Sequence, residues 1–206
     1  SEVFNCAAPD TGNMEVLARY GTPAQQAQWL PAFVSEEGAP LTAIAVNEPS
    51  LLFDPQKLAT RARRKGSHYL LSGEKCLVLR GLEASRLIVA AKTDPTQRHT
   101  GMSLLVVERG MDGFERGRNL DKIGMHSQDT AELFFNDVRV PVANLFGDEG
   151  KGFHYLTANL AQERLSIAVT GVATARAALG WTVDYVKERR AFGQPISSFQ
   201  NTKFVL

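Results

Sequence analysis

The sequence predicts a multi-domain α and β protein, in which a central antiparallel β barrel or sandwich is flanked by N-terminal and C-terminal helical segments. The first 39 residues have a helical pattern, and residues 40–145 contain short apolar or alternating runs separated by turn residues. A helical period returns in residues 146–206. Because strands and helices are segregated along the chain, we expect three parts with these boundaries and not an alternating βαβ fold.

The N-terminal part contains a well-marked helix start at Thr22. Thr22 suits an N-cap, Pro23 suits the first helical position and Gln25 lies three residues after the cap, as in a capping box. The helix is expected to run to Phe33. Its core-facing residues are Trp29, Leu30 and Phe33.

The pattern of the middle part predicts short strands. Turn residues recur every eight to twelve positions, which favours antiparallel pairing in a barrel or sandwich. The candidate strands are Leu41 to Val46, Leu58 to Lys65, His68 to Leu71, Lys75 to Leu79, Leu87 to Lys92, Ser103 to Glu108 and Ala131 to Phe135, with Gly66, Gly73, Gly81, Gly101 and Gly113 between them.

The C-terminal part begins with an amphipathic helix. Phe153, Leu156, Leu160 and Ile167 share one helical face, and residues 165–186 are apolar nearly all round. We therefore expect this helix to be buried in a bundle.

Composition excludes several classes of function. The chain has 206 residues with 23 Lys and Arg against 22 Asp and Glu, so no net field attracts nucleic acid or an anionic membrane. No stretch has the roughly 20 apolar residues that span a bilayer. Cys6 and Cys76 lie far apart, which argues against a zinc site and a disulfide framework. A start at Ser1 and a stop within a helical pattern suggest that both ends are cuts.

Glu163 is the candidate catalytic base. On a helical wheel it lies within the arc of the apolar face, and no basic residue stands three or four positions away. A carboxylate that faces apolar surface holds a proton more strongly, which suits removal of a proton from a weakly acidic carbon. The structural alternative is an ion pair with a basic residue from a distant helix.

The run Arg189–Pro195 also has two interpretations. Basic residues in the last helical turn and Gly193 in a left-handed cap would end the helix. Alternatively, a guanidinium grips a pyrophosphate while Phe192 packs on an aromatic base. The glycine-rich run Gly147–Gly152 lacks phosphate-loop spacing and is read as a helix-entry turn.

Two segments carry a resemblance to a known family: Ala8–Glu15 with Tyr20–Thr22, and Asp129–Phe135 with Val138–Pro141. The first resembles the end of the N-terminal helical domain of the acyl-CoA dehydrogenases, and the second resembles the last strand of their middle domain, as found in long-chain members. The resemblance extends over the whole length of the sequence. The resemblance implies the family's fold, FAD as cofactor and α,β-dehydrogenation of fatty or branched-chain acyl-CoA thioesters.

The resemblance also implies roles for the C-terminal part. Gln162–Leu165 is similar to the Glu-Arg-Leu motif of long-chain and isovaleryl members, which implies that Glu163 takes the α-proton while the flavin accepts the β-hydride. Arg189, Phe192 and Gln200 resemble a segment that reaches into a neighbouring subunit and holds the FAD diphosphate and adenine. This implies a homodimer, a homotetramer or a mixed oligomer with a homologue.

Two departures concern the flavin ring. Val46-Asn47-Glu48-Pro49 resembles a hydrophobic-Thr-Glu-Pro strand end, which implies that Val46 and Asn47 bind cofactor, but Ser50–Phe53 replaces a glycine- and serine-containing stretch. Leu77 and Leu79 stand where the family has an aromatic residue and a Ser or Thr beside the ring. Loss of the ring and of the hydroxyl would each cost on the order of 1 kcal/mol in cofactor affinity.

These features leave three functional hypotheses. The first is an active dehydrogenase that passes electrons to an electron-transfer flavoprotein or similar acceptor. The second is a non-catalytic member, either degenerate or lending its adenine-side residues to a partner's flavin. The third is oxidase chemistry on the same fold. The expected compartment is the mitochondrial matrix in a eukaryote and the cytoplasm in a bacterium.

Overall fold

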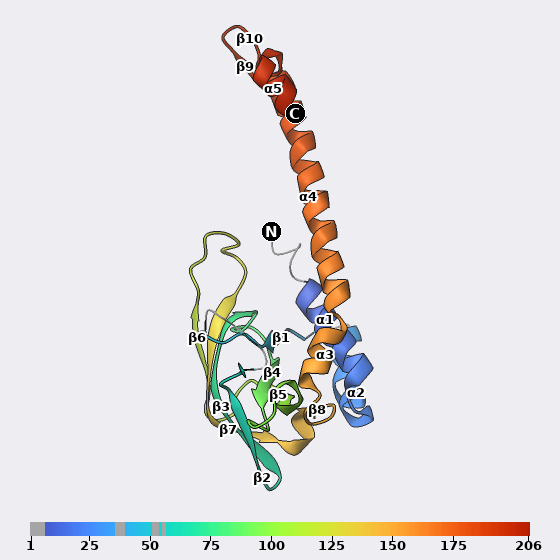
Figure 1. Ribbon diagram of the computed structural model, residues 1–206, viewed down its shortest axis with the longest axis vertical. Helices are drawn as coiled ribbons and strands as arrows, with labels where there is room; N and C mark the ends of the chain where they lie inside the picture. Colours follow the sequence, from blue (N-terminus) through green and yellow to red (C-terminus); the bar gives the residue numbers. More distant parts are fainter. Residues whose placement is uncertain (1–6, 36–39, 51–53, 55–56) are drawn as a thin grey trace. The chain divides into compact units, whose positions relative to one another are not determined.

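The computed structural model describes residues 7–35, 40–50, 54 and 57–206, with the side chains of residues 7–12 not described (Figure 1). The chain divides into two compact units, Ser1–Ala158 and Asn159–Leu206, and each is described on its own. The first unit joins the N-terminal helices and the β-sheet. The three-part division at residues 39/40 and 145/146 stays a prediction.

The N-terminal helices are α1 (Ala7–Tyr20) and α2 (Pro23–Trp29), followed by the 3-10 helix η2 (Leu30–Val34). The predicted capping box is confirmed. The Gln25 N–H donates to the Thr22 hydroxyl at 3.2 Å, and the Thr22 N–H donates to the Gln25 side chain at 3.1 Å. The Gln25 amide also donates to the carbonyls of Ala143 and Leu145, so Gln25 ties the helix to the segment 143–145.

Replacement of Thr22 with Ala is expected to lower the free energy of unfolding by about 1 kcal/mol, because it removes the side-chain acceptor for the Gln25 N–H. Chemical denaturation followed by far-UV circular dichroism measures the loss. Thr157→Ala is the matched control, since the Thr157 hydroxyl is exposed and donates only within its own helix. Equal losses in the two variants would contradict a capping role for Thr22.

Eight strands form one mixed sheet in the described part of the first unit. Their order is β6-β7-β3-β2-β4-β5-β8, with β1 paired to β4. The strands are β1 (Thr42–Ala45), β2 (Arg61–Lys65), β3 (His68–Leu79), β4 (Arg86–Lys92), β5 (Met102–Glu108), β6 (Phe114–Asn119), β7 (Thr130–Pro141) and β8 (Leu145–Phe146). The predicted fold class is confirmed with two differences: β1 and β2 pair with β4 in parallel, and the described strands do not close into a barrel.

The predicted strands do not include β6 or β8, and two of them correspond to the single strand β3. β6 contains a glycine and three charged residues among six, and β8 has only two residues, so neither has an apolar alternation. β3 continues through Gly73, which we had expected to end a strand. A Cβ on Gly73 would lie 2.7 Å from the Cα of Thr60, so this glycine permits a close approach of two backbones and not a turn.

The middle of the sheet is buried on both faces. Alternate residues of β4 and β5 enter two clusters, as the two-residue period of a strand requires. One cluster packs Leu87, Val89 and Leu105 against residues of β3 and β7. The other packs Ile88 and Val106 beneath the N-terminal helices and α3 (Gly152–Ala158), which lie on this side of the sheet in Figure 1. The predicted core positions of the N-terminal helix are confirmed: Trp29 belongs to this second cluster, and Leu30 and Phe33 pack against it.

The second unit consists of the 29-residue helix α4 (Leu160–Glu188), the short hairpin β9 (Arg190–Ala191) and β10 (Gln194–Pro195), the 3-10 helix η6 (Ile196–Ser198) and α5 (Gln200–Val205). The expected burial of α4 is not found within this chain. Val186 is its buried residue, whereas Ile167 and Trp181 are more than 70% exposed. Across the described residues, no helix combines the length and the hydropathy needed to span a membrane.

Candidate active site

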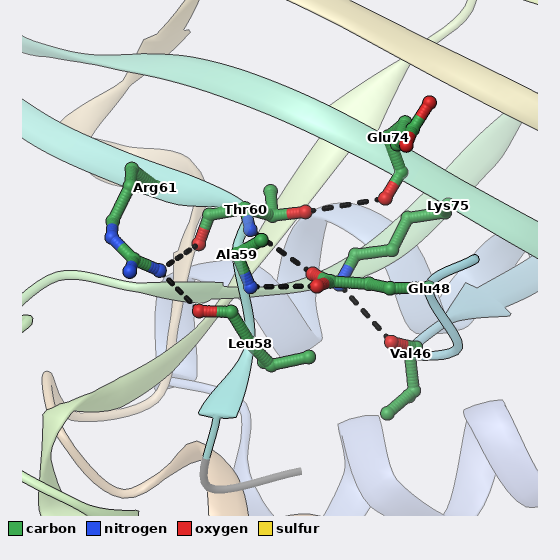
Figure 2. Close-up of polar contacts among 8 residues, drawn as sticks. All are labelled: Val46, Glu48, Leu58, Ala59, Thr60, Arg61, Glu74 and Lys75. Carbon is green, nitrogen blue, oxygen red and sulfur yellow. Dashed lines mark hydrogen bonds and ion pairs between the residues drawn. The ribbon is translucent and has the colours of Figure 1, made fainter. Parts of the chain in front are cut away.

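A buried polar cluster forms where the chain leaves β1 and passes beside β3 (Figure 2). Its centre is the Glu48 carboxylate, which accepts from the Lys75 ammonium at 2.8 Å and from the N–H groups of Ala59 at 2.6 Å and Thr60 at 3.0 Å. The Lys75 ammonium also donates to the Val46 carbonyl at 3.1 Å. Three segments distant in sequence therefore meet at one ion pair.

Burial governs the charge state of this pair. The Lys75 side chain is 0% exposed, and this burial lowers its pKa to about 8 although Glu48 stabilises the ammonium. Burial acts to raise the pKa of Glu48, but the Lys75 ammonium and the Ala59 N–H together hold it below its usual range. At neutral pH both groups are therefore ionised.

The lowered pKa of Lys75 predicts a pH-dependent stability. Between about pH 8 and pH 10.5 the unfolded chain retains a proton on Lys75 that the folded chain has lost. The free energy of unfolding should therefore rise with pH across this window, by on the order of 3 kcal/mol relative to Lys75→Met. Denaturation curves at several pH values measure the difference, with both proteins carrying Cys76→Ser because the Cys76 thiol interacts electrostatically with Lys75. Parallel pH profiles would contradict it.

The predicted flavin-side residues lie next to this pair. The Cys76 N–H donates to the Asn47 carbonyl at 3.0 Å, which joins the strand end Val46-Asn47 to β3. Here β3 has a bulge: Cys76 and Leu77 together face the single residue Glu132 of β7, and Leu77 has a φ of +53°.

The bulge turns apolar side chains outward. Leu77 is 57% exposed and Leu79 is 42% exposed, whereas Val78 between them is buried in the core. Asn47 is also exposed and Val46 is half-buried. The structure thus brings Val46, Asn47, Leu77 and Leu79 into one neighbourhood. Within the replaced stretch Ser50–Phe53, residues 51–53 lie outside the described residues.

The sequence patterns contain Glu48 in a strand-end motif and Lys75 in a candidate strand, but they predict no role for either residue. The available signal was a lysine in a strand between apolar neighbours, together with a glutamate just after another strand. Neither position shows by itself that the two side chains meet. Thr60, whose hydroxyl donates to the Glu74 carbonyl at 3.3 Å, was missed entirely.

The other predicted residues belong to the second unit. Glu163 lies in the first turn of α4, where its N–H donates to the Asn159 carbonyl at 3.0 Å. Its side chain is exposed to solvent, so the apolar surroundings expected for it are not found among the described residues of its unit. In the described part of the chain, no ion pair joins Glu163 to a basic residue of another helix, as the structural alternative requires.

The Arg189–Pro195 run forms a hairpin and not the expected glycine cap. Phe192 and Gly193 have φ values of +53° and +79° and form its two-residue turn, as in a type I′ connection. The prediction that Gly193 ends the helix is wrong, because α4 already ends at Glu188 with Arg189 extended. Phe192 is 95% exposed and contacts Phe199 edge to face at 6.3 Å between ring centroids.

Arg189, Phe192 and Gln200 all have exposed side chains in this second unit. They are therefore available to a molecule outside it. In the described part of the chain, no group of three or more His, Cys, Asp or Glu side chains is arranged to hold a metal ion.

Two family models match the chain. The acyl-CoA dehydrogenase middle domain matches residues 43–138, and the acyl-CoA dehydrogenase C-terminal domain matches residues 150–206. The chain belongs to the acyl-CoA dehydrogenase family. These two matches contain all the flavin-side residues, Glu163 and the exposed residues of the hairpin.

Individual relatives agree with this assignment to the acyl-CoA dehydrogenases. The mitochondrial long-chain specific acyl-CoA dehydrogenase of Rattus norvegicus is 41% identical over 195 residues, which cover 94% of this chain and 45% of the rat protein. The mitochondrial isovaleryl-CoA dehydrogenase of Pongo abelii is 40% identical over 89% of this chain and 44% of its own. The crystal structure of an acyl-CoA dehydrogenase from Geobacillus kaustophilus superposes with a TM-score of 0.87 at 46% identity, covering 93% of this chain and 50% of that chain. This chain thus spans about half the length of the relatives it matches.

Acyl-CoA dehydrogenases are flavoproteins, and the residues of the flavin-side neighbourhood determine how well it suits a flavin ring. The exposed Leu77 and Leu79 offer apolar surface to a flat ring system, and the backbone of the exposed Asn47 is hydrogen-bonded to the adjacent Cys76. No ring stacks from position 77 and no hydroxyl donates from position 79. The residues present fit a flavin ring through apolar contact, with fewer specific contacts than the family pattern provides.

Proposed function

We propose that the protein is an FAD-dependent dehydrogenase of acyl-CoA thioesters derived from fatty acids or branched chains. The observation that carries the proposal is the hydrogen bond between Cys76 and Asn47, which joins the Val46-Asn47 strand end to the bulge that exposes Leu77 and Leu79, in a chain of this family. Bound FAD would supply the acceptor for a hydride from the β-carbon.

The proposed role of Glu163 is to take the α-proton of the thioester. The substrate then loses one proton to the carboxylate and one hydride to the cofactor, and a carbon–carbon double bond forms. Glu163 lies at the start of a long helix, which supplies a rigid support for a base that must be held in line with the α-carbon. Segments outside this chain are proposed to supply the apolar cover.

Arg189, Phe192 and Gln200 are proposed to hold the diphosphate and adenine of FAD in a neighbouring subunit. Their exposure and the hairpin that presents Phe192 support this role. The proposed assembly is a homodimer, a homotetramer or a mixed oligomer with a homologue. An electron-transfer flavoprotein or similar acceptor would reoxidise the flavin. Relatives include mitochondrial and bacterial proteins, and we propose the matrix or the cytoplasm accordingly.

A second function is favoured by the substitutions at positions 77 and 79. A subunit that lends its adenine-side residues to a homologue would keep Arg189, Phe192 and Gln200 while its own ring-side residues change. Leu77 and Leu79 are changes of that kind.

The visible absorption spectrum of the intact protein, expressed alone and with a homologue, tests both functions. An active dehydrogenase is expected to bind one flavin per chain when expressed alone and to bleach its absorption on addition of an acyl-CoA. Flavin that is absent from the protein alone and present in the mixed complex would overturn this function and support the lending subunit. An absence of flavin from both would overturn the two together.

A further inference from the structure

The buried ion pair lies between the two segments that carry the flavin-side residues. Glu48 directly follows Asn47, and Lys75 directly precedes the bulge at Cys76 and Leu77. The ammonium of Lys75 bonds to both the Glu48 carboxylate and the Val46 carbonyl. One side chain of β3 therefore holds the strand end on both sides of Asn47.

A second layer of hydrogen bonds fixes the same carboxylate to the start of β2. The N–H groups of Ala59 and Thr60 donate to Glu48, and the Thr60 hydroxyl donates to the Glu74 carbonyl, one residue before Lys75 (Figure 2). Gly73 permits this arrangement because any side chain there would collide with Thr60. The pair is thus held from three directions, and its atoms have little freedom to adopt another geometry.

The cost of burying two charges indicates that this pair does more than add stability. An apolar pair of similar volume is often equally stable or more stable, because two charges lose hydration when they leave water. What an ion pair provides, when its carboxylate accepts from backbone N–H groups and its ammonium donates to a backbone carbonyl, is a single allowed geometry. Here that geometry determines where Asn47 lies relative to Leu77.

We propose that Glu48 and Lys75 are positioning residues whose ion pair sets the placement of the Val46–Asn47 strand end against the Cys76–Leu77 bulge, and thereby the affinity of the chain for the flavin ring. This inference rests on the proposed function. With Leu77 and Leu79 offering apolar contact alone, ring binding depends on the placement of the surface more than on individual hydrogen bonds.

Lys75→Met in the intact protein tests the proposal, with Lys92→Met as the matched control. Lys92 is also a buried lysine of the same sheet, but its ammonium donates to the carbonyls of Gln97 and Arg98 in the β4–β5 connection. Both variants lose a buried charge, so both lose thermal stability. The dissociation constant for FAD is measured by fluorescence well below either melting temperature, and the flavin midpoint potential is measured on the reconstituted proteins.

We expect Lys75→Met to raise the dissociation constant for FAD about tenfold or more and to shift the potential, because the ring surface loses its fixed geometry. Lys92→Met should change the constant less than about twofold. The double variant Glu48→Gln/Lys75→Met should have a dissociation constant for FAD no higher than that of the worse single variant, since the two residues act as one unit. Equal effects of Lys75→Met and Lys92→Met would overturn the positioning role while leaving the proposed function intact.

Hydrogen exchange supplies a readout that does not require flavin. In the cofactor-free proteins, Lys75→Met should speed exchange of the Cys76 amide about tenfold relative to Lys92→Met. The reason is that the Cys76–Asn47 hydrogen bond loses the adjacent bonds from Lys75 to Glu48 and to the Val46 carbonyl. Unchanged exchange at Cys76 would overturn the positioning role. A wild-type protein that binds no flavin, alone or with a homologue, would instead overturn the proposed function, and the exchange result would still decide whether the pair positions this segment.

Discussion

Glu163→Gln is expected to lower turnover of an acyl-CoA by about 10² to 10⁴-fold, because an amide cannot accept the α-proton and a positioned base contributes an effect of this size. Flavin content should not change, since Glu163 is not among the residues proposed to hold FAD. Anaerobic mixing with an acyl-CoA, followed at the flavin absorption maximum, measures the rate of bleaching directly.

Glu188→Gln is the control for this experiment. Glu163 lies in the first turn of α4 and Glu188 is the last residue of the same helix. Both carboxylates are exposed. The two variants therefore remove equal charge from one element at opposite ends. Bleaching that is equally slow in both, or normal in Glu163→Gln, would remove Glu163 as the base and would direct attention to a carboxylate beyond this chain.

Glu48→Gln is expected to lower the free energy of unfolding by about 3–5 kcal/mol, because it leaves the fully buried ammonium of Lys75 without a compensating charge. Lys75→Met should cost less, since the Glu48 carboxylate keeps the N–H groups of Ala59 and Thr60 as partners. Chemical denaturation monitored by fluorescence measures both losses.

Glu108→Gln is the comparison for this second prediction. The Glu108 carboxylate lies 3.9 Å from the Arg86 guanidinium, beyond hydrogen-bond distance, and the side chains are 39% and 32% exposed, so both residues keep contact with water. Its loss should cost less than about 1 kcal/mol. If Glu48→Gln and Glu108→Gln cost the same, burial of the Glu48–Lys75 pair has no energetic weight.

The sequence predicted the elements whose pattern is local. The capping box at Thr22 and Gln25 depends on residues three apart, and the core-facing Trp29 follows from helical spacing. The apolar runs of β4 and β5 gave their strands directly. β6 was missed because three of its six residues are charged, and the parallel pairing of β1 with β4 depends on contacts between residues more than forty positions apart.

The candidate site was only half accessible from sequence. Resemblance identified Val46, Asn47, Leu77 and Leu79, and the structure brings them together; their roles stay predictions, as do those of Glu163, Arg189, Phe192 and Gln200. The Glu48–Lys75 contact was not foreseen, because a pairing across 27 positions has no periodicity. The exposure of α4 was also not foreseen, since an apolar pattern predicts that a surface is covered without identifying the segment that covers it.

The pairing of β3 with β7 has a consequence for how the protein is made. Leu79 ends β3 and Thr130 begins β7, so a ribosome working at about 5–20 residues per second synthesises β7 roughly 3 to 10 s after β3. During that interval the β3 edge that will receive β7 has no partner from its own chain. We expect nascent chains to depend on chaperones most at this stage, and synonymous codons that slow translation between residues 80 and 130 to increase aggregation.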